Sequence, residues 1–171
     1  MEKLVFKKLD GTLIEDVNQY VKSWVKENPF GTVTIGCDSQ EFARHVKYAV
    51  VIVMHRVDRY EIGHGCHLLI STIFDKDIKA KSKRRMKDKE FDTTVLHAKL
   101  WKEVELTVLT AQMLDGCTKK IKIHLDYNSN ENEMSNALYE SGIGYARSMG
   151  YEAFGKPYST MASITADHFC R

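Results

Sequence analysis

Two aspartates stand at the carboxyl ends of two predicted strands. Asp38 follows the alternating stretch 32–37, and Asp126 ends the stretch 120–126. Each aspartate has the opposite parity to the apolar residues of its strand, so both can project from one face if the strands are parallel. Ligands of open α/β sheets gather at the carboxyl ends of the strands. The pattern indicates a binding site, although either aspartate alone could instead be a turn or N-cap residue.

Two predicted helices add acidic side chains to these aspartates. The long helix over 92–114 carries Glu103 and Glu105, and the last helix, over 159–169, carries Asp167 among small residues. Carboxylates that converge repel one another by roughly 1–4 kcal/mol per close pair, so a cluster needs protons or a divalent cation. Oxygen-rich sites of this kind suit Mg²⁺ or Mn²⁺.

A second set of possible metal ligands lies in the stretch His64-Gly65-Cys66-His67. A zinc site usually draws four ligands from two paired clusters, and the sequence offers no second cluster. The four cysteines include no C-x-x-C pair. We therefore expect no zinc site here and expect the cysteines to be reduced thiols.

The charge distribution points to one surface. The chain has a formal net charge of +2, but the segment Lys76–Lys89 contains eight basic and two acidic residues. Such a segment can bind a phosphate backbone. A solubilising exposed loop is an equally good interpretation. Protein partners cannot be inferred from the sequence.

The elements that must hold these residues alternate between helix and strand. Helices are predicted over 13–27, 92–114, 133–149 and 159–169, and strands over 32–37, 48–54, 60–74, 120–126 and 151–155. An antiparallel meander of three strands is thus followed by two β-α units. Crossovers through helices should place the fourth and fifth strands parallel to the first.

Length and composition limit the class of protein. A chain of 171 residues with 43% hydrophobic and 28% charged residues fits one globular domain, which we place over 1–171. The longest apolar run, 49–54, is far shorter than the ~20 residues of a membrane span. No charged and then apolar leader opens the chain, so we expect a cytoplasmic protein without a membrane partner.

Four segments in order resemble the YkuK-type family, a bacterial family of predicted ribonuclease H-like nucleases. They are 35–40 (IGCDSQ), 103–107 (EVELT), 124–126 (HLD) and 156–167, which runs from Lys-Pro to Ala-Asp. The resemblance implies a ribonuclease H-like fold with a mixed five-stranded sheet of order 3-2-1-4-5 and helices on both faces. It also implies a carboxylate site for two divalent ions and a nucleic acid substrate. The chain departs from the family after Asp126, where glycines are usual, and after Asp167, where His168 replaces arginine.

The resemblance carries four site residues over to this chain: Asp38, Glu105 or Glu103, Asp126 and Asp167. The two glutamates are about 200° apart around a helix, so only one can face the metals. We favour Glu105, because it agrees better with the general ribonuclease H pattern of a glutamate before an apolar run. Two Mg²⁺ or Mn²⁺ ions ~3.5–4 Å apart would then clamp a phosphodiester, with Asp38 bridging them.

Three further residues are candidates for supporting roles: His124 beside the metals, His168 in product release and Lys156 on phosphate. A buried strand histidine and a helix-end histidine are the simpler interpretations of the first two. The predicted function is a metal-dependent nuclease acting on RNA, DNA or a hybrid. The alternatives are a non-catalytic nucleic-acid-binding module on the same fold and a phosphohydrolase of another α/β class. The last usually needs a D-x-D-like loop, and Asp38-Ser39-Gln40 lacks the second aspartate.

Overall fold

The computed structural model describes residues 4–76, 93–118, 120–129, 136, 138–159 and 161–171. Most of the basic segment Lys76–Lys89 therefore lies outside the described residues, as does the predicted start of the helix at Glu133. In chain order the elements are β1 (Phe6–Lys7), β2 (Leu13–Ile14), α1 (Val17–Glu27), β3 (Thr32–Glu41), β4 (Val46–Val57), β5 (Gly63–Asp75), α3 (Thr93–Met113), β6 (Ile121–Asn128), α4 (Tyr139–Ser148), β7 (Glu152–Lys156) and α5 (Met161–Cys170).

The strands form one mixed sheet of seven strands in the order β2-β1-β5-β4-β3-β6-β7. The predicted five-stranded sheet was wrong in count, and its order 3-2-1-4-5 is incomplete, because β1 and β2 precede the five predicted strands in the sheet. The strands β1 and β2 extend the sheet beyond β5, through the pairing of Lys7 with Ile70. Sequence periodicity did not detect them, because two residues are too few to show alternation. The predicted antiparallel meander β3-β4-β5 and the parallel pairs β3-β6 and β6-β7 are confirmed.

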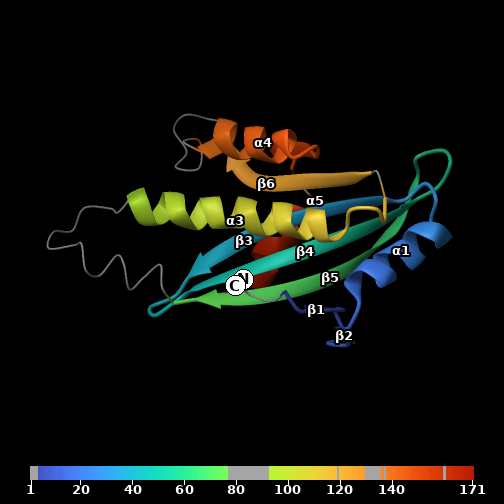
Figure 1. The fold of residues 1–171 in the computed structure, drawn as a ribbon, viewed down its shortest axis with the longest axis horizontal. Helices are drawn as coiled ribbons and strands as arrows, with labels where there is room; N and C mark the ends of the chain where they lie inside the picture. Colours follow the sequence, from blue (N-terminus) through green and yellow to red (C-terminus); the bar gives the residue numbers. More distant parts are fainter. Residues whose placement is uncertain (1–3, 77–92, 119, 130–135, 137, 160) are drawn as a thin grey trace, which may run out of the picture.

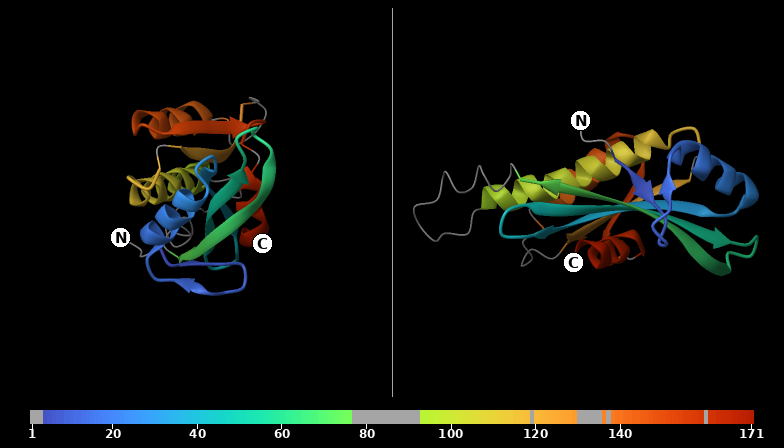
Figure 2. Two further views of the ribbon diagram at one scale, coloured as in Figure 1. Left: turned by 90° about the vertical axis from the view of Figure 1, so that its right-hand side faces the viewer. Right: turned by 90° about the horizontal axis from the view of Figure 1, so that it is seen from below.

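Helices cover both faces of the sheet, as Figures 1 and 2 show: α1, α3 and α4 lie on one face and α5 lies on the other. The large hydrophobic cluster contains the odd-numbered residues of β3, such as Val33 and Ile35, packed with residues of α1, α3 and α4. The smaller cluster joins Val51 and Val53 of β4 to Ala162 and Ala166 of α5. The two faces of the sheet are therefore the α3 face and the α5 face.

The central strand β4 contributes to both clusters, since successive side chains of a strand point to opposite faces. All seven residues from Tyr48 to Met54 are fully buried. This explains why the predicted strand reads as a continuous β-branched run rather than an alternating one. β3 is paired with this buried strand along its whole length, from Thr32 to Glu41.

The helices begin and end where local signals place them. Asp16 caps α1, because its side chain accepts a hydrogen bond from the backbone nitrogen of Gln19 at 2.9 Å. Gly150 follows α4 with a φ of +91°, which favours glycine after a helix. Within the described part of the chain, none of the helices is long and apolar enough to cross a bilayer.

Candidate carboxylate site

Asp38 and Asp126 lie where β3 and β6 separate. These parallel strands are paired from Val33–Ile121 to Cys37–Leu125, and each aspartate is the next residue along its strand. β3 does not end at this point, as the sequence had indicated, because it stays paired with β4 as far as Glu41. β6 and β7 are next paired only at Asn128 and Lys156. The site is thus at a fork in the sheet rather than at the ends of two strands.

A close contact between β3 and α5 brings Asp167 to the same face. Gly36 has the parity of Asp38, and a Cβ built on it would lie 2.8 Å from the Cβ of Ala162. Only a glycine lets the helix approach the strand this closely. The small residues Ser163 and Ala166 continue the buried side of α5. The end of the helix then lies over the sheet, where the thiol of Cys170 donates to the backbone oxygen of Asp38 at 2.7 Å.

Glu103 is the glutamate that α3 brings to Asp38. Its side chain is 2% exposed and accepts a short hydrogen bond from the hydroxyl of Ser39, the next residue after Asp38. Glu105 is exposed on the other side of the helix, so the structure does not bring it to the cluster. The structure thus brings Glu103, and not the favoured Glu105, to the cluster, and the choice of ligand stays a prediction. A usable signal was present, because Glu103 lies beside Leu100 and Thr107 on the apolar stripe of its own helix.

The four carboxylates influence one another electrostatically. Burial raises the pKa of Asp38 to about 6, and the nearby charges of Asp126 and Asp167 raise it as well, against a hydrogen bond from the Ser39 backbone. Burial, followed by the charge of Asp38, raises the pKa of Glu103 well above its ordinary value. Asp38 is the common neighbour of the other three. Positive charge close to it would therefore stabilise the ionised cluster.

Basic side chains already supply part of that charge. The ammonium group of Lys156 lies 2.7 Å from a carboxylate oxygen of Asp126. The guanidinium of Arg171 donates two hydrogen bonds to Asp167, at 2.6 and 3.2 Å. The hydrogen bond to Asp126 raises the pKa of Lys156, so this lysine is charged at neutral pH. Two of the four carboxylates are thus ion-paired and partly exposed, while Glu103 is buried.

The residues fit a divalent cation by chemistry rather than by their present spacing. All four are oxygen donors, and the repulsion around Asp38 is of the kind that a hard cation relieves. In the described residues, however, no group of three or more His, Cys, Asp or Glu side chains is close enough to hold a metal ion. Binding would require Lys156 and Arg171 to leave Asp126 and Asp167, both of which are at the partly exposed side of the cluster.

The histidines of the stretch His64-Gly65-Cys66-His67 have partners close by. His64 lies 3.0 Å from Asp58, and the ring of His67 is 2.8 Å from the hydroxyl of Tyr20. Cys66, between them, is exposed. Each histidine of this stretch thus has a hydrogen-bonding partner, Asp58 for His64 and Tyr20 for His67.

Histidines near the carboxylates take no visible part in the cluster. His124 is buried beside Phe154, and its Nδ1 atom lacks a hydrogen-bond partner in the described residues. Burial lowers the pKa of His124 to about 4, so the ring is neutral at physiological pH. His168 is exposed on α5, next to Phe169. Their suggested supporting roles stay predictions.

Comparison with known proteins supplies one match. The model of a family described as ribonuclease H-like matches residues 12–171. The chain belongs to the ribonuclease H-like family. No curated protein and no solved structure matches the chain significantly. Membership of this family suggests a nuclease type of function, and the matched region includes all four carboxylates of the fork.

Proposed function

We propose that the protein is a nuclease that hydrolyses phosphodiester bonds at the fork between β3 and β6. The observation that carries the proposal is the fully buried Glu103 carboxylate beside Asp38, in a chain of the ribonuclease H-like family. A buried carboxylate next to another one costs stability, so it is retained where it has a use. We further propose that the chain is of the YkuK type within this family and consists of a single domain.

Asp38, Glu103, Asp126 and Asp167 are the residues that would hold Mg²⁺ or Mn²⁺. When bound, the divalent ions supply a Lewis acid for the phosphodiester and the attacking water. Asp38 would be the central one of these ligands, because its charge interacts with those of the other three carboxylates. Ser39 holds the Glu103 carboxylate in place through its hydroxyl. These roles replace Glu105 by Glu103 and otherwise retain the residues predicted from sequence.

Lys156 has a second role in this proposal. In the structure its ammonium group neutralises Asp126. With Asp126 holding a divalent ion, the Lys156 ammonium group would be available to donate to a phosphate oxygen of the bound substrate. Lys156→Ala should therefore weaken substrate binding. If Lys156 only neutralised Asp126, Lys156→Ala would leave the substrate concentration at half-maximal rate unchanged.

A panel of labelled substrates tests the proposal directly. Single-stranded RNA and DNA, both duplexes and the hybrid are incubated with the protein in Mg²⁺, Mn²⁺ or EDTA. We expect cleavage of at least one substrate, and loss of that cleavage in EDTA. A panel left intact at high protein concentration would favour the alternative, a binding module that uses the same fold without catalysis.

The two glutamates of α3 provide a matched pair for the site. Glu103→Gln should reduce the cleavage rate at least about a hundredfold, because it removes one of the carboxylates that would hold the divalent ions at the reacting phosphate. Glu105→Gln changes the same residue type two positions away, on the exposed side of the helix, and should leave the rate unchanged. The reverse result would show that the site has been assigned to the wrong side of α3.

A further inference from the structure

Three aromatic rings lie in contact at the tip formed by the β3–β4 hairpin and the end of β5. Phe42 stacks on His45 with ring centroids 5.0 Å apart and planes 20° apart, and Phe74 of β5 meets His45 edge to face at 5.2 Å. The side chains remain accessible, since Phe42 is 38% and Phe74 is 54% exposed. Hydrophobic rings of this size are usually buried. Exposed aromatic rings at one tip of the sheet suit a ligand that has flat, apolar faces.

The strand register puts this tip on the same face as the candidate site. Gln40, Lys47 and Phe74 are paired across three strands and form one row of the sheet. The next row on that face begins with Asp38, two residues before Gln40. Phe42 follows Asp38 by four residues, which span about 13 Å or less at ~3.3 Å per residue, so the rings begin within about 13 Å of Asp38 along the chain. A single extended ligand could reach both.

The helix α5 ends just before the aromatic row. Cys170, its last residue, donates to the backbone oxygen of Asp38 at 2.7 Å and lies 3.9 Å from that of Lys47. The ammonium group of Lys47 then reaches the backbone oxygen of Arg171 at 3.3 Å. α5 ends at Cys170, and Phe74, in the same row as Lys47, is exposed among the described residues.

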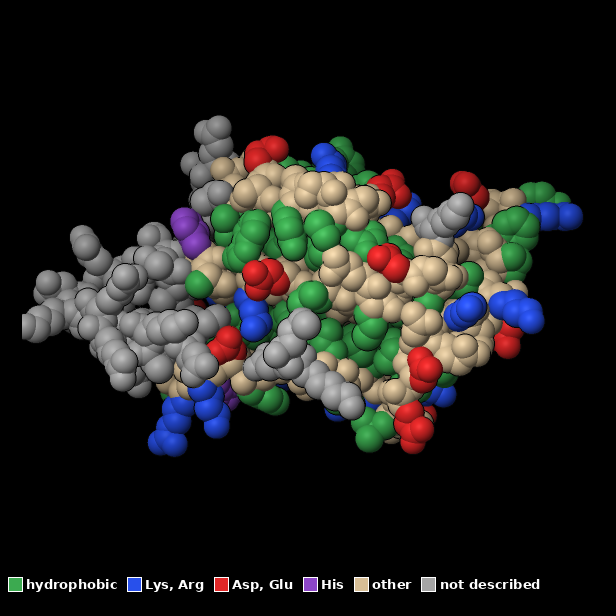
Figure 3. Space-filling view, in the orientation of Figure 1, with side chains coloured by type: hydrophobic (Ala, Val, Ile, Leu, Met, Phe, Trp, Pro, Cys, Tyr) green, Lys and Arg blue, Asp and Glu red, His purple; other side chains and the backbone are tan. Residues whose placement is uncertain are grey.

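The charges at the tip are separated between the two faces. Lys47 belongs to the aromatic row, and Arg44 and Lys76 are exposed at the ends of the adjoining strands. The acidic residues Glu41 and Asp75 pair with Val46 in the neighbouring row, which faces α3. On that α3 face, acidic and basic side chains are interspersed over the described surface (Figure 3). The aromatic row therefore carries one basic residue, Lys47, and no acidic residue, which suits a polyanion.

We propose that Phe42, His45 and Phe74 form a stacking platform for the bases of single-stranded nucleic acid next to the carboxylate fork. Proteins that bind single strands combine basic side chains that follow the backbone with aromatic rings on which bases stack. A duplex cannot use such a platform, because its base faces are already stacked on one another. The inference rests on the proposed function for the position of the reacting phosphate, and it identifies the substrate as single-stranded RNA or DNA.

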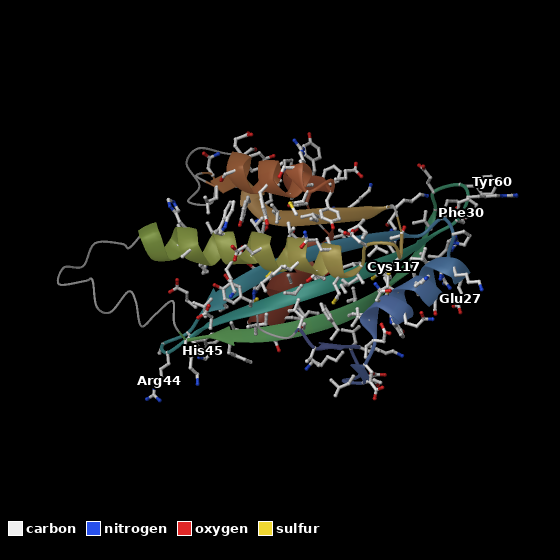
Figure 4. The ribbon with its side chains drawn as sticks, in the orientation of Figure 1. Glu27, Phe30, Arg44, His45, Tyr60 and Cys117 are labelled. Carbon is white, nitrogen blue, oxygen red and sulfur yellow. The ribbon has the colours of Figure 1, made fainter. Side chains whose placement is uncertain are left out.

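The other end of the sheet supplies a matched control. Phe30 is 52% exposed, and Figure 4 shows it with Tyr60 at the opposite tip from Arg44 and His45. Phe30→Leu removes the same ring from an equally exposed position far from the platform. Phe42→Leu and Phe74→Leu keep an apolar side chain and remove the stacking face. Phe42→Tyr keeps the aromatic ring and should bind as the parent does.

Binding is measured by fluorescence anisotropy with labelled single-stranded and duplex oligonucleotides, in EDTA, on the full chain carrying Asp38→Asn. We expect each platform variant to weaken single-strand binding roughly 5- to 100-fold, the range of one lost stacked base. Phe30→Leu and Phe42→Tyr should bind like the parent, and duplex binding should be weaker and unaffected. Thermal melting of each variant shows whether it is folded.

The result separates this inference from the proposed function. Equal single-strand affinity in the parent and both platform variants would overturn the platform, even if the wild-type protein cleaves nucleic acid. A parent that binds no single strand, or that prefers the duplex, would overturn it as well. Loss of single-strand binding in the platform variants would support the platform even if the wild-type protein cleaves no substrate at all.

Discussion

Two aspartates at opposite ends of the sheet have opposite electrostatic environments. Asp58, in the turn between β4 and β5, accepts hydrogen bonds from the backbone nitrogens of Tyr60 and Ile62 and contacts His64. The hydrogen bond with His64, together with these backbone bonds, lowers the pKa of Asp58. Asp38 is partly buried among carboxylates, and its pKa is raised to about 6. The surroundings of Asp58 thus stabilise an ionised carboxylate, whereas those of Asp38 disfavour its ionisation.

The difference separates an aspartate that stabilises the fold from one that has another use. The bonds of Asp58 are all local, so they define the turn in which the residue lies. Asp38 is opposed by Asp126 and Asp167, which come from β6 and α5. A fold under no functional constraint would replace one of them, since burial of like charges costs stability. We therefore expect substitutions of the two aspartates to have different effects in every test below.

The largest difference is expected in activity. Asp38→Asn should lower the cleavage rate at least about a thousandfold, because a shared ligand of the reacting centre has no substitute. Asp58→Asn should retain the wild-type rate at temperatures where it is folded. Initial rates on the best substrate of the panel measure both. If Asp38→Asn keeps more than a tenth of the activity, the chemistry does not take place at the fork.

The response to divalent cations should separate the two ends next. Mn²⁺ at a hundred times its dissociation constant stabilises a folded protein by about 2.7 kcal/mol. The thermal midpoint of the wild type and of Asp58→Asn should therefore rise with Mn²⁺, and that of Asp38→Asn should rise far less. Differential scanning fluorimetry with and without EDTA measures the shifts. An equal rise in all three proteins would place the cation away from Asp38.

Metal-free stability should change in opposite directions. Replacing Asp38 by asparagine removes a partly buried charge whose pKa shift of about two corresponds to at most about 2–3 kcal/mol. Asp38→Asn should therefore unfold at higher urea than the wild type at pH 7.5, whereas Asp58→Asn, which loses the negative charge that the turn and His64 stabilise, should unfold at lower urea. If both variants are less stable in EDTA, Asp38 is a structural residue.

The pH dependence gives the smallest and most specific difference. A folded-state pKa of about 6, above the ordinary value near 3.9, means that Asp38 favours the folded state below about pH 4, and that this contribution is lost between about pH 4 and 6. The lowered pKa of Asp58 means the reverse: its contribution is present above the ordinary value and lost in acid. The stability of Asp38→Asn relative to wild type should thus increase from pH 4.5 to 6.5 in urea unfolding without metal.

His124 changes its protonation in the same pH range as Asp38, so the test compares the stability of Asp38→Asn with that of the wild type. Its lowered pKa means that stability is lost as the pH falls from about 6.5 towards 4, which opposes the effect of Asp38. Both proteins contain His124, so its contribution cancels in the difference between them. A relative stability that is constant from pH 4.5 to 6.5 would contradict the raised pKa of Asp38.

Local patterns predicted most of the elements and three of the four carboxylates at the fork. The alternation in β3 and β6 assigned Asp38 and Asp126 to one face, and the parallel pairing of these strands bears that out. The small residues before Asp167 indicated a helix that approaches the sheet closely, and the contact of Ala162 with Gly36 is such an approach. These features depend on neighbours within a few residues, where sequence spacing and spatial spacing agree.

The remaining features depended on residues far apart in the sequence. Burial of Glu103 rather than Glu105 was set by the face of α3 that packs on the sheet, and by the hydroxyl of Ser39, 64 positions away. The aromatic contact at the tip joins Phe74 of β5 to His45, which lies just before β4 and 29 positions earlier in the sequence. The sequence by itself therefore determined the periodicity of each element and the residue types available for chemistry. Only the tertiary structure decided which of those residues meet, because strand register and helix packing join segments that no local pattern connects.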